Sequence, residues 1–325
     1  MSNSKVLIIA GGSPSSILAT ALLCRARGIT AGDIGDGDVS VVFAQAFEVW
    51  GNDRSGRPYA VQTAIESLPE DGFVLWVGLG VNNRDPEMTA SAFRAMGARI
   101  TGVYDEHEPE RWETLKTELG LHEGFFFCRG KEQGVLSAAS LTASGADTDH
   151  IFRLAGDWAD NRQLEVSPEA QALAWAIDTA TKVRIVDNQF RVTTLLHLLD
   201  DPQAARLFQE RLEEGMATEM ATQAALDSAE LCGNVLVIRQ PSGVEINQTS
   251  AMFSGYRRAP FVAIVGQKAG EGEVVVVGLN TRHADLGSTN LLQVLAEFQA
   301  SGIPQKATIR GGDVNTIVGV LNSLS

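Results

Sequence analysis

The chain has 325 residues, enough for about two domains, because a single hydrophobic core seldom grows beyond roughly 250 to 300 residues. Its hydrophobic fraction of 44% is typical of globular proteins, and no apolar run approaches the roughly 20 residues that cross a bilayer. The net charge of −14 argues against nonspecific binding to long polyanions, because such binding depends on clustered Lys and Arg. We therefore expect no membrane partner, and small or short phosphorylated ligands rather than duplex nucleic acid.

The amino terminus and the cysteines bear on cellular location. The first apolar run covers only Val6 to Ala10, which is too short for the core of a signal peptide. The three cysteines, Cys24, Cys128 and Cys232, lie far apart and show no C-x-x-C spacing, so neither a disulfide framework nor a zinc site is indicated. We expect reduced cysteines and a cytoplasmic protein.

The first half of the chain alternates short apolar runs with segments of helical spacing. Such runs, when Gly-rich turns follow them, are typical of buried strands. The expected strands are residues 5–10, 39–43, 73–77, 99–104 and 124–128, and the expected helices are residues 17–26, 63–68, 86–96 and 135–142. Strands that alternate with helices predict an α/β domain with a parallel sheet covered on both faces.

From residue 167 the pattern becomes helical and later returns to strands. Ser167-Pro168-Glu169 and Asp200-Asp201-Pro202 are typical helix starts, and the second of these helices is expected to connect two domains. Beyond it the sequence predicts strands at 234–240, 260–267 and 273–282, and helices at 289–302 and 315–324. The expected organisation is an α/β domain at 1–195, a helical connector at 196–231 and a smaller mixed α/β domain at 232–325.

The fourth expected strand ends close to Asp105, with His107 two residues later. Two parallel strands with a helix between them place their carboxyl ends side by side, at the edge where α/β sheets bind ligands. An acid and a histidine at that edge are typical of a metal or phosphate site. The unit resembles the DHH phosphoesterase superfamily, whose members carry an Asp-His-His triplet there; here the triplet reads Asp105-Glu106-His107.

The resemblance implies a parallel-sheet DHH-like domain in which most of the metal-binding residues have been replaced. In active members the first strand ends in a His-x-Asp-x-Asp-Gly loop whose carboxylates hold manganese or magnesium. Here Gly11 takes the place of the histidine, and Ser13 and Ser15 take the places of the two aspartates. None of these residues binds a hard cation tightly. The family's next motif, Asp-x-Gly, reads Gly78-Leu79-Gly80, so that an aspartate that bridges the metals is also missing.

The resemblance also implies that three residues keep the chemistry of metal ligands. Asp105 and His107 match the first and last members of the triplet. Residues 154–162 resemble the family's later Gly-x-x-x-Asp motif, which places Asp160 on the remaining aspartate. A rival alignment would use Asp178 instead. The resemblance therefore implies at most one manganese or magnesium ion at Asp105, His107 and Asp160, and none if catalysis has been lost.

The loop from Gly11 to Ser16 has chemistry of its own. Its two glycines let the backbone approach a ligand, and Ser13, Ser15 and Ser16 together with the N–H groups of the following helix can bind an anion. Serines at a helix start are also ordinary N-caps, and both interpretations remain open. The loop is neither a P-loop, which needs Gly-Lys-Ser/Thr, nor the dinucleotide fingerprint G-x-G-x-x-G.

A second set of substrate contacts is implied near the carboxyl terminus. In the DHH-associated domain an arginine-bearing strand and a Gly-Gly-His motif bind the phosphate or base of the substrate. Here Arg282 follows an expected strand, and the motif reads Arg310-Gly311-Gly312-Asp313, in which the histidine is absent. The resemblance implies that Arg282, Arg310, Gly311 and Gly312 face the serine loop across a cleft.

Two functions remain open. The first is a divergent DHH-family protein that has no two-metal activity and binds a nucleotide, a short single-stranded nucleic acid or a protein partner. The second is a phosphoesterase, a hydrolase that acts on a small nucleotide or phosphorylated substrate with one divalent metal held by Asp105, His107 and Asp160. Two-metal hydrolysis needs ions roughly 3.5 to 4 Å apart that are held by several carboxylates, and these three residues are too few for it.

Overall fold

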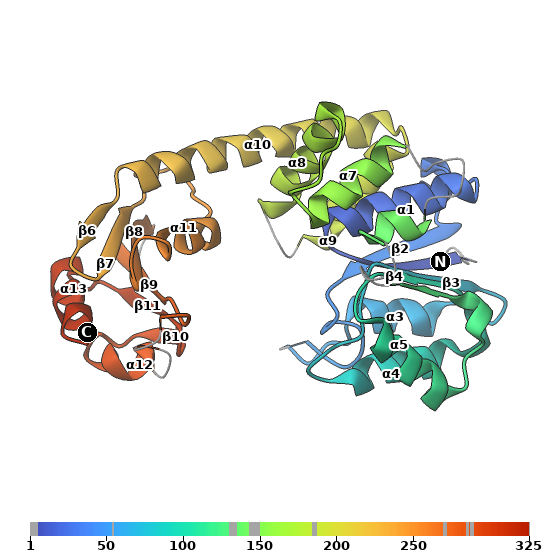
Figure 1. Cartoon of the computed structure of the whole chain (residues 1–325), viewed down its shortest axis with the longest axis horizontal. Helices are drawn as coiled ribbons and strands as arrows, with labels where there is room; N and C mark the ends of the chain where they lie inside the picture. The colour runs from blue at the N-terminus through green and yellow to red at the C-terminus, as the bar shows by residue number, and fades with distance from the viewer. Residues whose placement is uncertain are drawn as a thin grey trace. The chain divides into compact units, whose positions relative to one another are not determined.

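The computed structural model describes residues 6–53, 55–129, 135–142, 150–183, 187–268, 272–283, 286 and 289–324. The chain divides into two compact units, Met1–Glu213 and Glu214–Ser325. The boundary falls within helix α10 (Pro202–Asp227), in the region where the sequence predicts a connector. Each unit is built around a sheet of its own (Figure 1).

The sheet of the first unit consists of five parallel strands in the order β2-β1-β3-β4-β5. The strands are β1 (Val6–Gly11), β2 (Val39–Ala44), β3 (Phe73–Val77), β4 (Ile100–Asp105) and β5 (Phe126–Cys128). The inner strands are almost entirely apolar and buried because helices cover both faces. The predicted parallel α/β sheet is confirmed.

Helices cover the two faces of this sheet as separate layers (Figure 1). Along β1, Ile8 and Ala10 face one core while Leu7 and Ile9 face the other, as the two-residue period of a strand requires. Five helices belong to the first core: α1 (Pro14–Ala26), α6 (Ala138–Thr142), α7 (Ile151–Asp160), α8 (Pro168–Lys182) and α9 (Asn188–Leu198). The second core belongs to α3 (Ala60–Ser67), α4 (Pro86–Met96) and α5 (Pro109–Leu119), while the short α2 (Ala31–Gly35) precedes β2.

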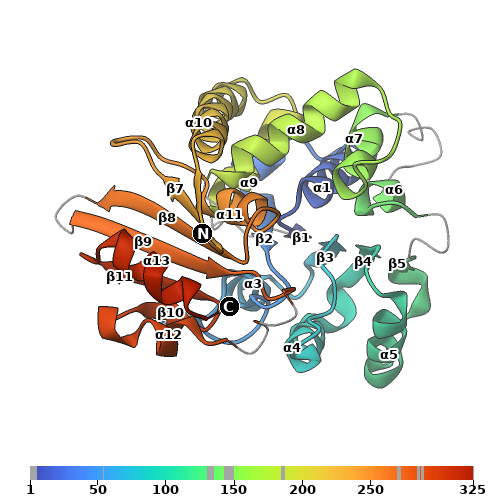
Figure 2. The same ribbon diagram turned by 60° about the vertical axis from the view of Figure 1, so that its left-hand side comes forward.

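The second unit contains a mixed sheet of six strands in the order β10-β11-β9-β8-β7-β6 (Figure 2). Only β7 and β8 pair in parallel. The strands are β6 (Glu230–Cys232), β7 (Val235–Arg239), β8 (Phe261–Lys268), β9 (Gly272–Leu279), β10 (Ser301–Ile303) and β11 (Lys306–Arg310). Helices α12 (Leu291–Val294) and α13 (Val314–Asn322) cover one face, whereas α11 (Gln248–Gly255) and the end of α10 cover the other. The predicted mixed α/β architecture is confirmed.

One expected helix is wrong. The segment 289–302 forms only the short α12, a 3₁₀ turn at Ala296–Phe298 and then strand β10. Gln299 adopts a left-handed φ of 52°, which ends the helical path. The chain then turns back and pairs β10 with β11, so tertiary pairing prevails over the local helical pattern.

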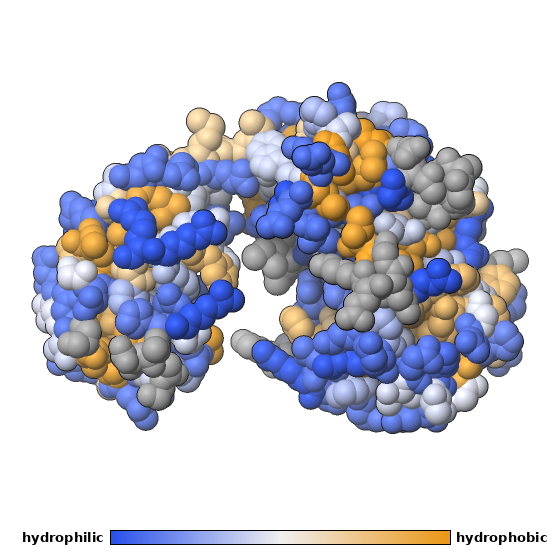
Figure 3. Space-filling view, viewed as in Figure 1, coloured by the Kyte–Doolittle hydropathy of each residue, from blue (hydrophilic) through white to orange (hydrophobic). Residues whose placement is uncertain are grey.

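No helix among the residues that the structure describes is long and apolar enough to cross a membrane. On the face drawn in Figure 3, hydrophilic side chains predominate over α3, α4 and α5. This distribution accords with the net charge of −14.

Candidate functional site

Asp105 ends β4 at the carboxyl edge of the first sheet and is fully buried. Its Oδ1 lies 2.9 Å from Nδ1 of His107, and its Oδ2 accepts a hydrogen bond of 2.6 Å from Nε1 of Trp112 on α5. Trp112 also packs edge-on against Trp76 in the core. Asp105 therefore holds α5 in place as well as offering a carboxylate to a ligand.

Glu106, the middle residue of the triplet, is buried with one unpaired carboxylate oxygen. Its Oε1 lies 3.6 Å from Nδ1 of His107, and its Oε2 has no hydrogen-bond partner. Burial and, to a smaller extent, the charge of Asp105 raise the pKa of Glu106 to about 7. A nearby cation would stabilise the ionised carboxylate and satisfy this oxygen.

His107 is the exposed member of the cluster. The hydrogen bond to Asp105 raises the pKa of His107 to about 9, so that the imidazole carries a proton at neutral pH. Ligand atoms of Asp105, Glu106 and His107 lie within 4.8 Å of one another, a grouping that no other such residues make in the described part of the chain. Because a histidine must lose its proton before it binds a metal, metal binding at His107 would release a proton.

A pocket of about 380 Å³ opens beside this cluster. The loops that follow β1, β2, β3 and β4 meet there, as they do at the ligand sites of open parallel sheets. Its polar lining includes Ser13, His107 and Asp160, which the sequence singled out, and also Gln45 and Asn83, which it did not. The backbones of the neighbouring glycines complete the wall; these are Gly11, Gly12, Gly78 and Gly80.

The two acids proposed for the late motif lie in different surroundings. Asp160, the last residue of α7, lines the pocket, and its charge acts on both Glu106 and His107. Asp178 on α8 pairs with Arg162 at 3.1 Å and with Lys182 at 2.5 Å, and it does not line the pocket. The geometry therefore favours Asp160 as the acid of the site.

The three serines of the first loop form a hydrogen-bonded cluster. Oγ of Ser13 lies 3.0 Å from Oγ of Ser15 and 2.8 Å from Oγ of Ser16, and it caps α1 by accepting from the backbone N–H of Ser16 at 3.2 Å. Ser15 and Ser16 are each 1% exposed, and only Ser13 lines the pocket. The capping role is therefore present, while phosphate contact by these serines stays a prediction.

Backbone and side-chain packing close two positions at which the resemblance implies metal ligands. A Cβ atom at Gly11 would lie 2.1 Å from the carbonyl oxygen of Gly78, and a Cβ atom at Gly78 would lie 2.4 Å from Oγ of Ser16. Gly78 also has a left-handed φ of 55°, and its carbonyl accepts a hydrogen bond of 2.9 Å from Ser16. With the loop in this arrangement, neither position has room for a side chain.

Arg191 on α9 lies behind the same loop, and no motif in the sequence marks it. Its side chain is buried, its Nε donates to the carbonyl of Gly12 at 3.0 Å, and its Nη1 donates to Oδ1 of Asn188 at 2.6 Å. The charges of Asp187 and Glu48 act on the guanidinium. Because Gly12 and Arg191 are 179 residues apart in the chain, only tertiary packing brings this cation behind the loop.

The predicted contacts near the carboxyl terminus belong to the second unit. Gly311 turns the chain with a φ of 73°, Gly312 packs closely against apolar side chains, and Asp313 caps α13. The turn at Gly311 and the close packing at Gly312 explain why these two positions are glycines without any ligand contact. Arg282 and Arg310 are exposed, and phosphate contact by either stays a prediction.

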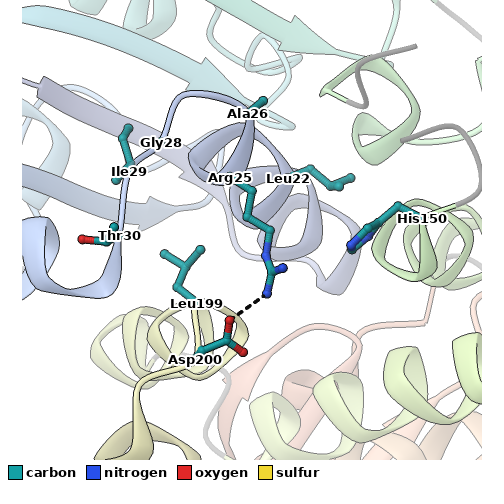
Figure 4. A pocket seen from close by; sticks show the side chains of 9 residues that line it. All are labelled: Leu22, Arg25, Ala26, Gly28, Ile29, Thr30, His150, Leu199 and Asp200. Atoms are coloured by element: carbon teal, nitrogen blue, oxygen red, sulfur yellow. Dashed lines mark hydrogen bonds and ion pairs between the residues drawn. The ribbon is translucent and has the colours of Figure 1, made fainter. Parts of the chain in front are cut away.

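A larger pocket of about 530 Å³ lies at the other end of α1 (Figure 4). Arg25 points into it, donates to the carbonyl of Leu198 at 2.8 Å and pairs with Asp200 at 3.3 Å. Since α1 has 13 residues, this pocket is roughly 20 Å from the serine loop. It shares no lining residue with the pocket beside His107 and contains none of the motif residues.

Comparison with known proteins gives a likeness in structure only. No family model and no curated protein matches the sequence. Among solved structures, the exonuclease RecJ bound to manganese aligns with a TM-score of 0.51 at 12% identity, over 99% of this chain and 89% of that chain. The pGpG-specific phosphodiesterase PggH from Vibrio cholerae gives 0.47 at 12% identity, over 98% and 97%. CDC45 from Entamoeba histolytica gives 0.46 at 10% identity, over 99% and 95%.

The chain is thus an α/β protein whose fold is similar to that of RecJ along nearly its whole length. The predicted resemblance to the DHH superfamily is confirmed at the level of the fold. An identity of 12% establishes the fold alone, so activity and ligand have to be argued from the residues of this chain.

Proposed function

We propose that this chain is a divergent DHH-family protein that lacks two-metal phosphodiesterase activity and binds a nucleotide or a short single-stranded oligonucleotide. The ligand occupies the pocket beside His107. The observation that carries the proposal is the close packing at Gly11 and Gly78, where an added Cβ would lie 2.1 Å from the carbonyl oxygen of Gly78 and 2.4 Å from Oγ of Ser16, respectively. At Gly11 and Gly78, two positions where the DHH family has metal ligands, the residue type is changed and the surrounding atoms leave no room for a side chain.

Several groups that line the pocket can donate hydrogen bonds to an anion, alongside the carboxylates of Glu108 and Asp160. Protonated His107, the amide of Gln45 and the amide of Asn83 are hydrogen-bond donors at the pocket, and the hydroxyl of Ser13 can also donate. The buried guanidinium of Arg191 adds positive charge behind the loop. Such donors bind a phosphate without a metal, and charge-assisted hydrogen bonds are the strongest of these contacts.

A second candidate function rests on the unpaired oxygen of Glu106. Asp105, Glu106 and His107 offer ligand atoms within 4.8 Å of one another, and the buried Oε2 of Glu106 has no hydrogen-bond partner, while Asp160 lines the pocket beside them. A bound ion would supply Lewis acidity toward a phosphoryl oxygen. The candidate is therefore a one-metal phosphoesterase that acts on a small phosphorylated substrate.

Calorimetry and an activity assay separate the two candidates. We expect adenosine 5′-monophosphate to bind with EDTA present, and His107→Gln to weaken that binding while His122→Gln, a change at an exposed histidine away from the pocket, leaves it unchanged. With manganese present, we expect no turnover of bis(p-nitrophenyl) phosphate.

The opposite result would support the one-metal enzyme. That result is manganese-dependent turnover which Asp160→Asn abolishes and Asp178→Asn preserves. If no nucleotide binds and no ester is hydrolysed, a protein partner becomes the remaining ligand class.

A further inference from the structure

Phe47 is unusual among the apolar residues of the loop that follows β2. Val49 in this loop is fully buried, and Phe43 and Ala44 at the end of the strand are 1% and 3% exposed. Phe47 is 58% exposed. Phe47 therefore leaves an aromatic face open to solvent between half-buried neighbours.

Phe47 directly follows three residues that line the pocket beside His107. Ala44, Gln45 and Ala46 line that pocket, and Phe47 is the next residue. The backbone N–H of Glu48 donates to the carbonyl of Gln45 at 2.8 Å, and Oε2 of Glu48 accepts from the N–H of Gln45 at 3.3 Å. These two bonds close a tight turn, with Phe47 near its tip.

The pocket offers space and polar donors but little aromatic surface of its own. A volume of about 380 Å³ is that of a site for one small ligand. Its donors, which include His107, Gln45 and Asn83, would bind the phosphate and sugar. None of its lining residues is aromatic apart from the imidazole of His107, so a base held there has no other ring to stack on.

We propose that Phe47 is the base-stacking residue of this pocket, and that its ligand therefore carries a nucleobase and is not a sugar phosphate or inorganic phosphate. The inference rests on the proposed function. Stacking on an aromatic side chain is worth enough to change affinity roughly five-fold to one-hundred-fold, and every base has a face that can take part. Phe47 thus determines ligand class, while the donors deeper in the pocket hold the phosphate.

The test compares two ligands on matched variants, with EDTA present. Wild-type protein should bind adenosine 5′-monophosphate at least about ten-fold more tightly than ribose 5-phosphate. Phe47→Ala and Phe47→Leu should remove this preference, and Leu separates the aromatic face from simple apolar bulk. Phe47→Trp should keep it. Phe73→Ala is the control, because Phe73 is 51% exposed but begins β3 at the opposite edge of the sheet.

The outcomes distinguish failure of this inference from failure of the proposed function. If wild-type protein prefers the nucleotide and the Phe47→Ala and Phe47→Leu variants retain the preference, the stacking role is overturned and nucleotide binding stands. If wild-type protein binds both ligands equally, the stacking role is likewise overturned. If it binds neither ligand, both the proposed function and this inference are overturned.

Discussion

Asp105 shows how one side chain serves both the core and the ligand site. Its two oxygens contact Nδ1 of His107 and Nε1 of Trp112, so the acid fixes an imidazole on one side and the aromatic core under α5 on the other. Substitution by alanine would leave the indole N–H of Trp112 buried without an acceptor, at a cost of about 1 to 3 kcal/mol. Asparagine keeps an acceptor for Trp112 and is the better probe.

Asp105→Asn should lower the pKa of His107. In the metal-free wild-type protein the hydrogen bond to the carboxylate raises the pKa of His107 to about 9. A neutral amide cannot stabilise the imidazolium in the same way, so we expect the pKa to fall toward the ordinary histidine value. Titration of the imidazole protons by NMR measures it, and an unchanged pKa in the variant would show that Asp105 is not the cause.

Stability of the metal-free protein should fall as pH rises through the range in which Glu106 ionises. Burial raises the folded-state pKa of Glu106 to about 7, above the value of 4.5 in the unfolded chain. The folded state therefore holds the proton more tightly, and stability is lost between about pH 4.5 and 7. Glu106→Gln should flatten this part of the profile, measured by urea unfolding with EDTA present. If the free energy of unfolding of Glu106→Gln falls with pH as steeply as that of the wild-type protein, ionisation of Glu106 is not the cause of the loss.

At the scale of elements, the ends of β1 and β3 decide what the site can hold. These strands pair in register from Val6 to Ala10, and this pairing brings Gly11 against Gly78 directly beyond them. The serine hydroxyls and Arg191 then surround the loop that carries metal ligands in the DHH family. These contacts fix the backbone path of the loop by packing it against α1 and α9.

Gly78→Ala should destabilise the protein by about 1 to 3 kcal/mol more than Gly97→Ala. Both glycines have a positive φ, 55° at Gly78 and 56° at Gly97, so both substitutions strain the backbone. The added methyl would meet Oγ of Ser16 at 2.4 Å in one case and nothing within 4 Å in the other. Urea unfolding of the two variants measures the added cost of this close contact. If both variants lose the same free energy of unfolding, the loop can relax around the added methyl and position 78 has room for a side chain.

The strands of the first unit could be predicted because burial on both faces makes most of them continuous apolar runs, and glycines follow β1 and β3. The segment 289–302 could not, because pairing of β10 with β11 depends on a strand that follows it in the chain. Asp105, His107 and Asp160 could be chosen as candidate site residues from their spacing and from the resemblance, because they lie at or near the ends of a strand or a helix. Arg191 could not, because no local pattern marks a residue that reaches the site through packing, whereas Gln45 directly follows β2 and could have been found from the strand end.

At the scale of the whole molecule, the chain contains two units with separate hydrophobic cores. Ile8 and Leu7 belong to the cores of the first unit, whereas Ile317 and Leu295 belong to that of the second. Each sheet is covered on both faces by helices of its own unit, α10 being shared between the two. Stability of one unit is therefore expected to be largely independent of the other.

Ile317→Ala should destabilise the second unit alone. Ile317 is fully buried, and loss of its side chain leaves a cavity that costs about 2 to 5 kcal/mol. Hydrogen exchange should accelerate in β7, β8, β9 and β11 while β1, β3 and β4 keep their protection. Equal acceleration in both sheets would show that the chain unfolds as one cooperative body.

The most direct test of the central claim, that this fold no longer holds a two-metal centre, is the number of manganese ions bound per chain. Calorimetric titration, with electron paramagnetic resonance of the bound ions, should give at most one weakly bound ion that requires Asp105 and Asp160, no signal from a coupled pair, and no rise in melting temperature at micromolar manganese. Two ions per chain bound at micromolar concentration, with a coupled-pair signal, would contradict the account.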